Sequence, residues 1–194
     1  MTTKHRVLEV ASASFAERGV AGTSLDELAR RLGVTKQTIL YHFKSKDGLI
    51  EAVVNDAAAA LYGELAAALE ASEPGWDRIE ASVRAVFALA VRRPELLGLL
   101  REVSRLGPPH TDALALGLAP LIERSVSALR QGMAGGHLQR SDPRLVLALA
   151  YALITGAVTD TEVLRVLGME LDLRVAARLR RTVLDFLRAA LAPS

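Results

Sequence analysis

Two short amphipathic segments separated by only two residues constrain the fold of this 194-residue chain more than any other feature. The first begins at Ser24, with Glu27 three residues later, a spacing at which hydroxyl and carboxylate satisfy each other's free backbone amides at a helix start. Its apolar residues share one face, and Gly33 ends it. Thr35 can cap a second helix at once. We therefore expect two short helices joined by a tight turn.

The second helix, expected from Thr35 to Phe43, has one apolar and one polar face. Ile39 and Phe43 are four residues apart and face inward. Hydrogen-bonding side chains without an acid among them gather on the other face: Gln37, Thr38, Tyr41 and His42. Such groups can bind base edges and phosphates. This pattern is typical of a helix-turn-helix whose second helix enters the major groove of DNA.

Positive charge follows this helix and is concentrated in the N-terminal quarter of the chain. Lys44 and Lys46 stand at the start of the next helix, where ammonium groups and free backbone amides together attract a phosphate. Residues 1–50 hold eight Lys/Arg against five Asp/Glu, a net charge of +3, and residues 51–194 carry a net charge of −1. A small basic segment suits an anionic partner.

The rest of the chain predicts only helices, since no segment shows strand alternation and Ala and Leu dominate. A stripe from Leu8 to Phe15 predicts a helix that ends at Gly19, and a long helix runs from about Ser45 to a break near residue 72. Five further helices are expected at about 76–92, 94–106, 110–132, 142–167 and 172–191.

Several classes of protein are excluded by residue types that the chain lacks. With no cysteine, it has neither disulfides nor thiolate chemistry, and its histidines lack metal-ligand spacing. Neither G-x-S-x-G nor a dinucleotide fingerprint is present, so we expect no enzyme, no metal and no cofactor. Glu9 interrupts any signal-peptide core, and the longest uncharged run, 145–159, is shorter than the roughly 20 residues of a membrane span. We expect a cytoplasmic protein without a membrane partner, and a fully buried helix over this run.

The stretch TSLDELARRLGVTKQTILYHFKSKDGLIEAV, residues 23–53, resembles the N-terminal DNA-binding head of the TetR family of bacterial transcriptional regulators, and the match extends from about Val7 to Val54. The resemblance implies an all-α fold in which a three-helix head is joined by a long helix to a helical body. The head would comprise residues 1–46, and the effector-binding and dimerisation body residues 47–194.

Carried over by position, the resemblance also implies which residues meet double-stranded DNA. The phosphate contacts would be Ser24, Tyr41, His42 and Lys46. The residues approaching bases would be Lys36, Gln37 and Thr38, and Thr35 and Lys44 complete the DNA-facing set. Leu40 stands where many members carry a tyrosine, so one hydroxyl contact is lost or replaced by an apolar contact with a thymine methyl group.

The body supplies mainly Leu, Ala and Val, so a cavity in it would suit a hydrophobic or amphiphilic effector. The bulky or polar residues expected to line it are Phe87, Arg101, His110 and Tyr151, and the cations expected near it are Arg84, Arg101 and His110. The homodimer interface is expected on the run 145–159 and the apolar face of 175–187, at Gly156, Leu179, Val183 and Phe186.

Together these features predict a ligand-responsive DNA-binding regulator, a homodimeric repressor that occupies a near-palindromic operator and is released by an apolar or amphiphilic small molecule. An activator would use the same parts. The alternatives are an all-helical protein-interaction scaffold and an all-helical enzyme, neither of which binds nucleic acid.

Overall fold

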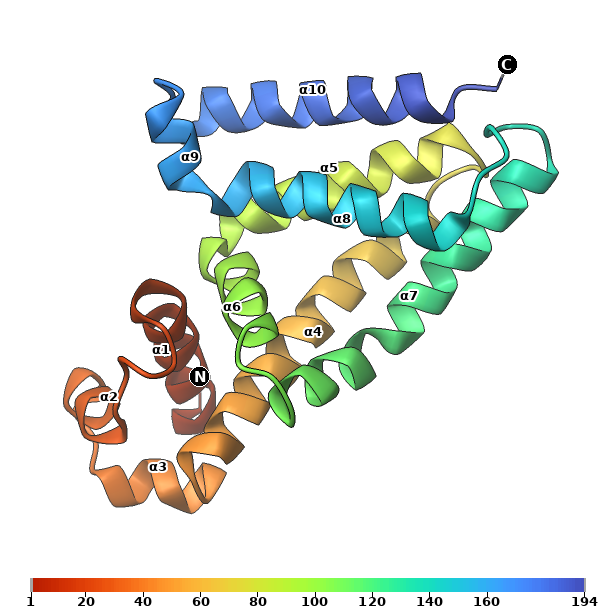
Figure 1. The fold of residues 1–194 in the computed structure, drawn as a ribbon. Coiled ribbons are helices and arrows are strands. Elements are labelled where there is room, and N and C mark those ends of the chain that lie inside the picture. Colours follow the sequence, from red (N-terminus) through yellow and green to blue (C-terminus); the bar gives the residue numbers. More distant parts are fainter. Residues whose placement is uncertain (1, 194) are drawn as a thin grey trace. The chain divides into compact units, whose positions relative to one another are not determined.

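The computed structural model describes residues 2–193, apart from the side chains of residues 97 and 161, and these residues form helices and loops without a strand. The all-helical prediction is therefore confirmed (Figure 1). In chain order the helices are α1 (Thr3–Arg18), α2 (Leu25–Leu32), α3 (Lys36–Phe43), α4 (Lys46–Glu70), α5 (Trp76–Arg92), α6 (Pro94–Ser104), α7 (His110–Ala134), α8 (Pro143–Thr159), α9 (Thr161–Val166) and α10 (Leu173–Leu191).

The helices divide between two compact units. Unit 1 comprises Met1–Ala60 and Arg93–Leu118, and unit 2 comprises Leu61–Arg92 and Ala119–Ser194. The chain passes from one unit to the other within α4, between α5 and α6, and within α7. Unit 1 thus adds α6 and parts of α4 and α7 to the three N-terminal helices. The boundary at residues 46 and 47 separates the predicted DNA-binding head from the predicted effector-binding body, and it stays a prediction.

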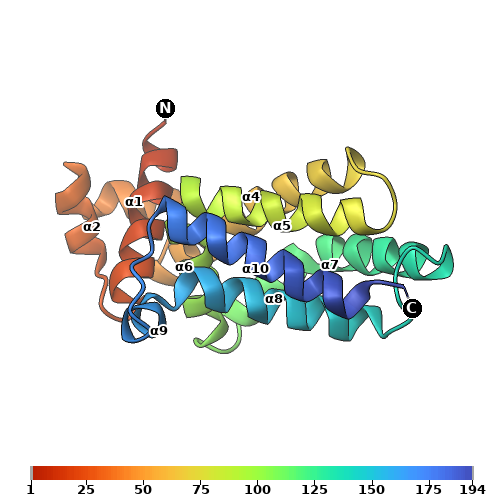
Figure 2. The ribbon, with the colours of Figure 1, turned by 90° about the horizontal axis from the view of Figure 1, so that it is seen from above.

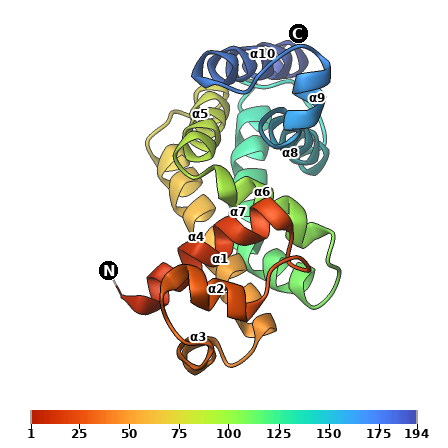
Figure 3. The same cartoon turned by 90° about the vertical axis from the view of Figure 1, so that its left-hand side faces the viewer.

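In unit 1, α1 packs against α2, α3 and α6 (Figure 3). The largest fully buried side chains include Phe15 of α1, Leu28 of α2 and Ile39 of α3. Leu99 and Val103 of α6 are also among them. Each buried side chain of this size contributes roughly 1.5–3 kcal/mol relative to an exposed one. The apolar faces of α2 and α3 are buried in this core, so the polar face of α3 stays at the surface.

The turn after α1 is fixed by a glycine and by a carboxylate from α6. Gly19 has φ +73°, and a Cβ atom there would lie 2.8 Å from Oε1 of Glu102. The same oxygen accepts a hydrogen bond from the backbone amide of Val20 at 3.3 Å. Gly19 ends the first helix where the sequence predicts, and α6 touches the turn that leads into α2.

Unit 2 is built around three helices that pack against one another, α5, α8 and α10 (Figure 2). Their shared core consists of Val83, Phe87, Ile154, Val183 and Leu187. A smaller cluster joins the end of α7 to the end of α10 through Met133, Leu138 and Leu191. The C-terminal helix thus contributes one face to both clusters, and its other face remains at the surface.

The uncharged run 145–159 is not the fully buried helix segment that the sequence suggests. Ile154 of α8 packs in the core of unit 2, but Leu145, Leu149 and Leu153 are exposed, Leu149 to 70%. These three leucines recur every fourth residue and therefore share one face of the helix. An absence of charge predicted burial, but in this chain it marks an apolar surface.

The single helix expected at 142–167 is two helices, and this prediction was wrong. The break lies at Asp160, which has ψ 61° and ends α8 before α9 begins. The hydroxyl of Thr159 donates back to the carbonyl oxygen of Thr155 at 2.7 Å. Thr and Asp side chains compete with the helix for backbone hydrogen bonds, and the sequence TDT carries three of them in a row.

One described helix, α4, is long and apolar enough by length and composition to cross a membrane. A third of its most apolar window is buried inside this chain. Core helices meet the same criteria of length and composition, so this feature alone is weak evidence for a membrane span.

Candidate nucleic-acid interface

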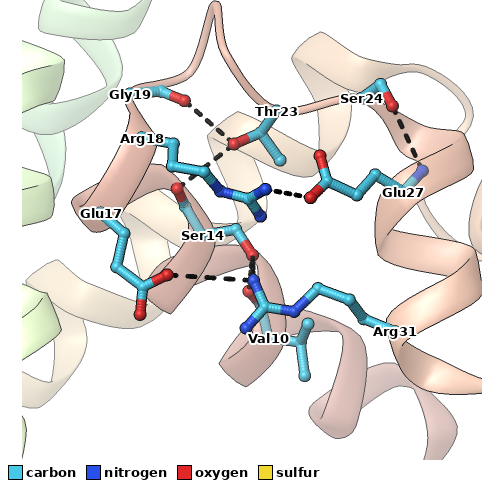
Figure 4. Close-up of polar contacts among 9 residues, drawn as sticks. All are labelled: Val10, Ser14, Glu17, Arg18, Gly19, Thr23, Ser24, Glu27 and Arg31. Carbon is cyan, nitrogen blue, oxygen red and sulfur yellow. Dashed lines mark hydrogen bonds and ion pairs between the residues drawn. The ribbon is translucent and has the colours of Figure 1, made fainter.

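The loop that leads into α2 is held by buried hydrogen bonds (Figure 4). The hydroxyl of Thr23, which is buried, lies 3.2 Å from the carbonyl oxygen of Ser14 and 3.0 Å from that of Gly19. Ser24 follows at the surface and caps α2, because its Oγ accepts a hydrogen bond from the amide of Glu27 at 3.2 Å. The predicted phosphate contact Ser24 is thus exposed on a fixed backbone.

Of the two reciprocal hydrogen bonds predicted between Ser24 and Glu27, only the one accepted by the Ser24 hydroxyl forms. The carboxylate of Glu27 binds the guanidinium of Arg18 on α1, rather than returning to the amide of Ser24 (Figure 4). A second arginine, Arg31 of α2, donates to Oγ of Ser14 at 2.8 Å. Both arginines therefore tie α2 to α1, and the sequence pattern missed this because each partner lies on another helix.

Helix α3 begins at a threonine cap and turns its apolar residues inward. Oγ1 of Thr35 accepts a hydrogen bond from the amide of Thr38 at 3.1 Å and lies 2.9 Å from the Thr38 hydroxyl. Ile39 and Phe43 are buried, which confirms the predicted inward face. Gln37 is exposed beside the cap. Residues at the N-terminal end of such a helix are those that meet base edges in helix-turn-helix proteins.

The C-terminal end of α3 presents aromatic and basic side chains together. Tyr41 is 74% exposed, and its ring and that of His42 meet edge to face with centroids 5.2 Å apart. The ammonium group of Lys44 donates to the carbonyl oxygen of Tyr41 at 3.0 Å and lies 5.5 Å from the centre of its ring. This arrangement holds a phenol hydroxyl and a cation at one place on the surface.

Helix α4 starts two residues later with its own cap. Oγ of Ser45 accepts a hydrogen bond from the amide of Gly48 at 2.9 Å. Lys46 is the first residue of this helix and is half-buried. The first residue of α4 thus carries an ammonium group, and the free amides of a helix start attract an anion such as a phosphate.

One charged contact at this surface was not expected from the sequence. Nζ of Lys36, the first residue of α3, lies 2.9 Å from Oδ2 of Asp26 in the first turn of α2. The polar face of α3 has no acid of its own, but the turn brings one beside it. A search for opposite charges on the two sides of the glycine turn, ten positions apart, would have paired Asp26 with Lys36.

The comparisons with known proteins agree with this geometry. Residues 7–53 match the family model of "Bacterial regulatory proteins, tetR family". The N-terminal part of the chain is therefore a DNA-binding domain of the TetR family, and the chain carries this domain. It is a DNA-binding transcriptional regulator, and the proteins to which it is similar are regulators rather than enzymes.

Similarity to TetR-family members extends beyond the head. The chain is 26% identical over 153 residues to the HTH-type transcriptional repressor KstR2 of Mycolicibacterium smegmatis, covering 78% of this chain and 73% of that protein. Two solved structures share the fold. The regulator FadR of Bacillus subtilis in complex with stearoyl-CoA has a TM-score of 0.79 at 17% identity, covering 94% of this chain and 96% of that one. A putative regulator from Saccharomonospora viridis in complex with choline has a TM-score of 0.81 at 20% identity, covering 98% of both.

The residues predicted to line an effector pocket are distributed over both units. In unit 2, Phe87 packs in the core and Tyr151 is exposed. In unit 1, Arg101 is half-buried on α6, and Nε2 of His110 lies 3.9 Å from Oδ1 of Asp47. The four residues stay predictions.

The other predicted cation, Arg84, is engaged by a neighbour on the same helix. Its Nε and Nη2 lie 3.0 and 2.5 Å from Oε1 of Glu80. This hydrogen bond from Arg84 lowers the pKa of the Glu80 carboxyl below its usual value. An exposed, already paired guanidinium is a poor ligand for an anionic effector.

A pocket of about 390 Å³ in unit 2 lies at the connection between α7 and α8. Its lining consists of Met133, Ala134, Gly136, Leu138, Gln139, Arg140 and Pro193. None of the four predicted effector residues contributes to it.

The four residues predicted for the dimer interface differ in their exposure to solvent. Phe186 of α10 is 64% exposed, whereas Val183 is 3% exposed and packs in the core of unit 2. Leu179 is half-buried against the same core. At Gly156 no atom beyond the neighbouring backbone of α8 lies within 4 Å of the place that a Cβ would take. Phe186 and Gly156 therefore leave surface for a partner, and Val183 does not.

Proposed function

We propose that this TetR-family protein is a homodimeric repressor that occupies a near-palindromic operator and leaves it when an apolar or amphiphilic small molecule binds its helical body. The observation that carries the DNA-reading part is the exposed polar face of α3. Buried Ile39 and Phe43 fix the orientation of that helix, and capped helix starts stand at both of its ends. Such a protein acts on the chromosome, in the cytoplasm.

In this proposal the residues at the two ends of α3 have different roles. Lys36, Gln37 and Thr38 at its start read base edges, because the first residues of a recognition helix lie deepest in the groove. The phosphate-binding residues are Ser24, Thr35, Tyr41, His42, Lys44 and Lys46. Exposure of Ser24 and Tyr41 and the position of Lys46 at a helix start support this division.

The homodimer would form through α8 and α10. Leu145, Leu149 and Phe186 expose large apolar side chains on these two helices, which contact each other. Exposed apolar side chains that gather in this way are typical of a protein interface. The open space at Gly156 would let a partner helix approach closely. Two heads related by a two-fold axis and about 34–36 Å apart would read two half-sites one helical turn apart.

The effector would bind the conformation that does not bind DNA, because a ligand shifts an equilibrium only by its differential affinity for the two states. An aliphatic body favours an acyl chain or a hydrophobic drug over a sugar or a nucleotide. The stearoyl-CoA bound by FadR of Bacillus subtilis supports this class, and the choline bound by the Saccharomonospora viridis regulator adds a small cation.

A gel-shift experiment with the DNA upstream of the protein's own gene tests the proposal. We expect a retarded complex that a scrambled fragment of equal length does not compete away. We expect one dimer to bind each palindromic site. Equal binding to both fragments, or no complex at micromolar protein, would contradict a role as an operator-binding repressor.

A further inference from the structure

The ion pair between Lys36 and Asp26 joins the two helices of the proposed DNA-reading motif. Its N–O distance is 2.9 Å, and the side chains are 43% and 66% exposed. Lys36 opens α3, whose first residues face base edges in the proposed complex. Asp26 therefore places a carboxylate at the surface that is proposed to meet a polyanion.

The other polar groups around Asp26 are already engaged in the fold. Ser24 caps α2, and Glu27 binds Arg18. An acid in the first turn also interacts favourably with the helix dipole, by about 0.3–1 kcal/mol. That effect accounts for an acid at position 26 but does not require its carboxylate to reach across the turn to a lysine on the next helix.

We propose that Asp26 is a specificity-determining residue of the operator complex. It holds the ammonium group of Lys36 away from the phosphates and over the base edges. Lysine donates to guanine O6 and N7, and an aspartate accepts from cytosine N4, so the pair offers one donor and one acceptor to G·C-containing steps. This role rests on the proposed function, because it needs α3 in the major groove.

Two opposing charge effects decide where Lys36 goes on DNA. In water an exposed ion pair contributes only about 0.2–1 kcal/mol, so phosphates compete for the lysine effectively. If Lys36 left, however, the Asp26 carboxylate would face the phosphates alone and be repelled. The pair therefore stays together and releases no counterion, unlike Lys46, for which the described residues provide no carboxylate within ion-pair distance.

The test is the salt dependence of binding by an Asp26→Asn variant, on the operator fragment and on scrambled DNA. Asparagine keeps the size of the side chain, and the cap of α2 at Ser24 stays in place. With its counter-charge gone, Lys36 should reach a phosphate. The slope of log K against log[salt] should then steepen by about 0.9, the value for one added phosphate contact. Preference for the operator over scrambled DNA should fall at least about fivefold, as the loss of one good base contact requires.

Two matched variants separate this effect from a general change in charge. Glu170→Gln removes one negative charge from an exposed position in the loop before α10, and it should leave both slope and preference unchanged. In a Lys36→Ala background, Asp26→Asn should no longer steepen the slope, because the lysine that would reach the phosphate is gone.

The outcomes distinguish this inference from the proposed function. If the wild type discriminates between operator and scrambled DNA but Asp26→Asn matches it in slope and preference, the inference is wrong and the proposed function stands. The same holds if Glu170→Gln changes the slope as much. If the wild type does not discriminate, the proposed function fails, and this inference fails with it.

Discussion

At the scale of single residues, the polar side chains of unit 1 divide into those that hold the fold and those that remain at the surface. Arg18 and Arg31 join α1 to α2, and Thr23 holds the loop between them. Gln37 and Tyr41 are exposed instead. The sequence alone predicted the second group, because helical spacing assigns faces within one helix. It missed the partners of the first group and Asp26, since those contacts depend on how separate helices pack.

This division predicts different consequences for two substitutions on the DNA-facing surface. Lys46→Ala should weaken binding to every DNA sequence alike, and the slope of log K against log[salt] should become shallower by about 0.9, as loss of one phosphate contact requires. Gln37→Ala should instead change which operator variants bind best and leave the slope unchanged. Titrations of both variants at several salt concentrations measure these effects. Wild-type affinity in both would mean that α3 does not enter the groove.

At the scale of helices, most boundaries were predictable because caps and glycines mark them. Ser24, Thr35 and Gly33 stand at the ends of α2 and α3, as their residue types predict. The break at Asp160 was not predicted, because the apolar pattern continues through it and only the local hydrogen bonding of Thr159 departs from the helix. Hydrophobic spacing locates helices, but it does not show where a helix is interrupted.

Glycines in different backbone conformations should respond oppositely to alanine. Gly63 lies inside α4, and nothing occupies the space of an added Cβ, so Gly63→Ala should raise the free energy of unfolding by about 0.5–1 kcal/mol. Gly19→Ala should lower it, because Gly19 has φ +73° and the new methyl would meet Glu102. Urea denaturation of both variants gives the two signs. Stabilisation by Gly19→Ala would contradict the structure of this turn.

At the scale of the whole molecule, the sequence identified the apolar residues of α8 and α10 but did not show which of them are buried within the chain. An uncharged run is compatible with burial inside one chain or between two chains, and periodicity does not distinguish them. The structure buries Ile154 and Val183 within unit 2 and exposes Leu149 and Phe186. The part of the predicted interface on the core side of α10 therefore belongs to the fold, and the exposed part is what a second copy could cover.

If α8 and α10 form the dimer, a charge on their exposed face should separate the protomers. Leu149→Glu should give a monomer at micromolar concentration, since it places a carboxylate in an apolar contact. Operator affinity should fall with it, because a single head binds one half-site. Leu116→Glu is the matched control, an exposed leucine on α7 given the same charge. Sedimentation velocity compares them. A wild-type monomer, or a dimer that survives Leu149→Glu, would contradict this interface.

The proposed release mechanism also predicts an equality between two measurements on the intact protein. If stearoyl-CoA lowers operator affinity by some factor, saturating operator DNA must lower stearoyl-CoA affinity by the same factor, because coupling free energy is reciprocal. Free coenzyme A is the matched control: it retains the nucleotide end without the acyl chain and should release no DNA. Fluorescence titrations of both ligands, each with and without the other, measure the two factors. Release by a sugar or a nucleotide alone, with acyl compounds and hydrophobic antibiotics inactive, would contradict an apolar effector.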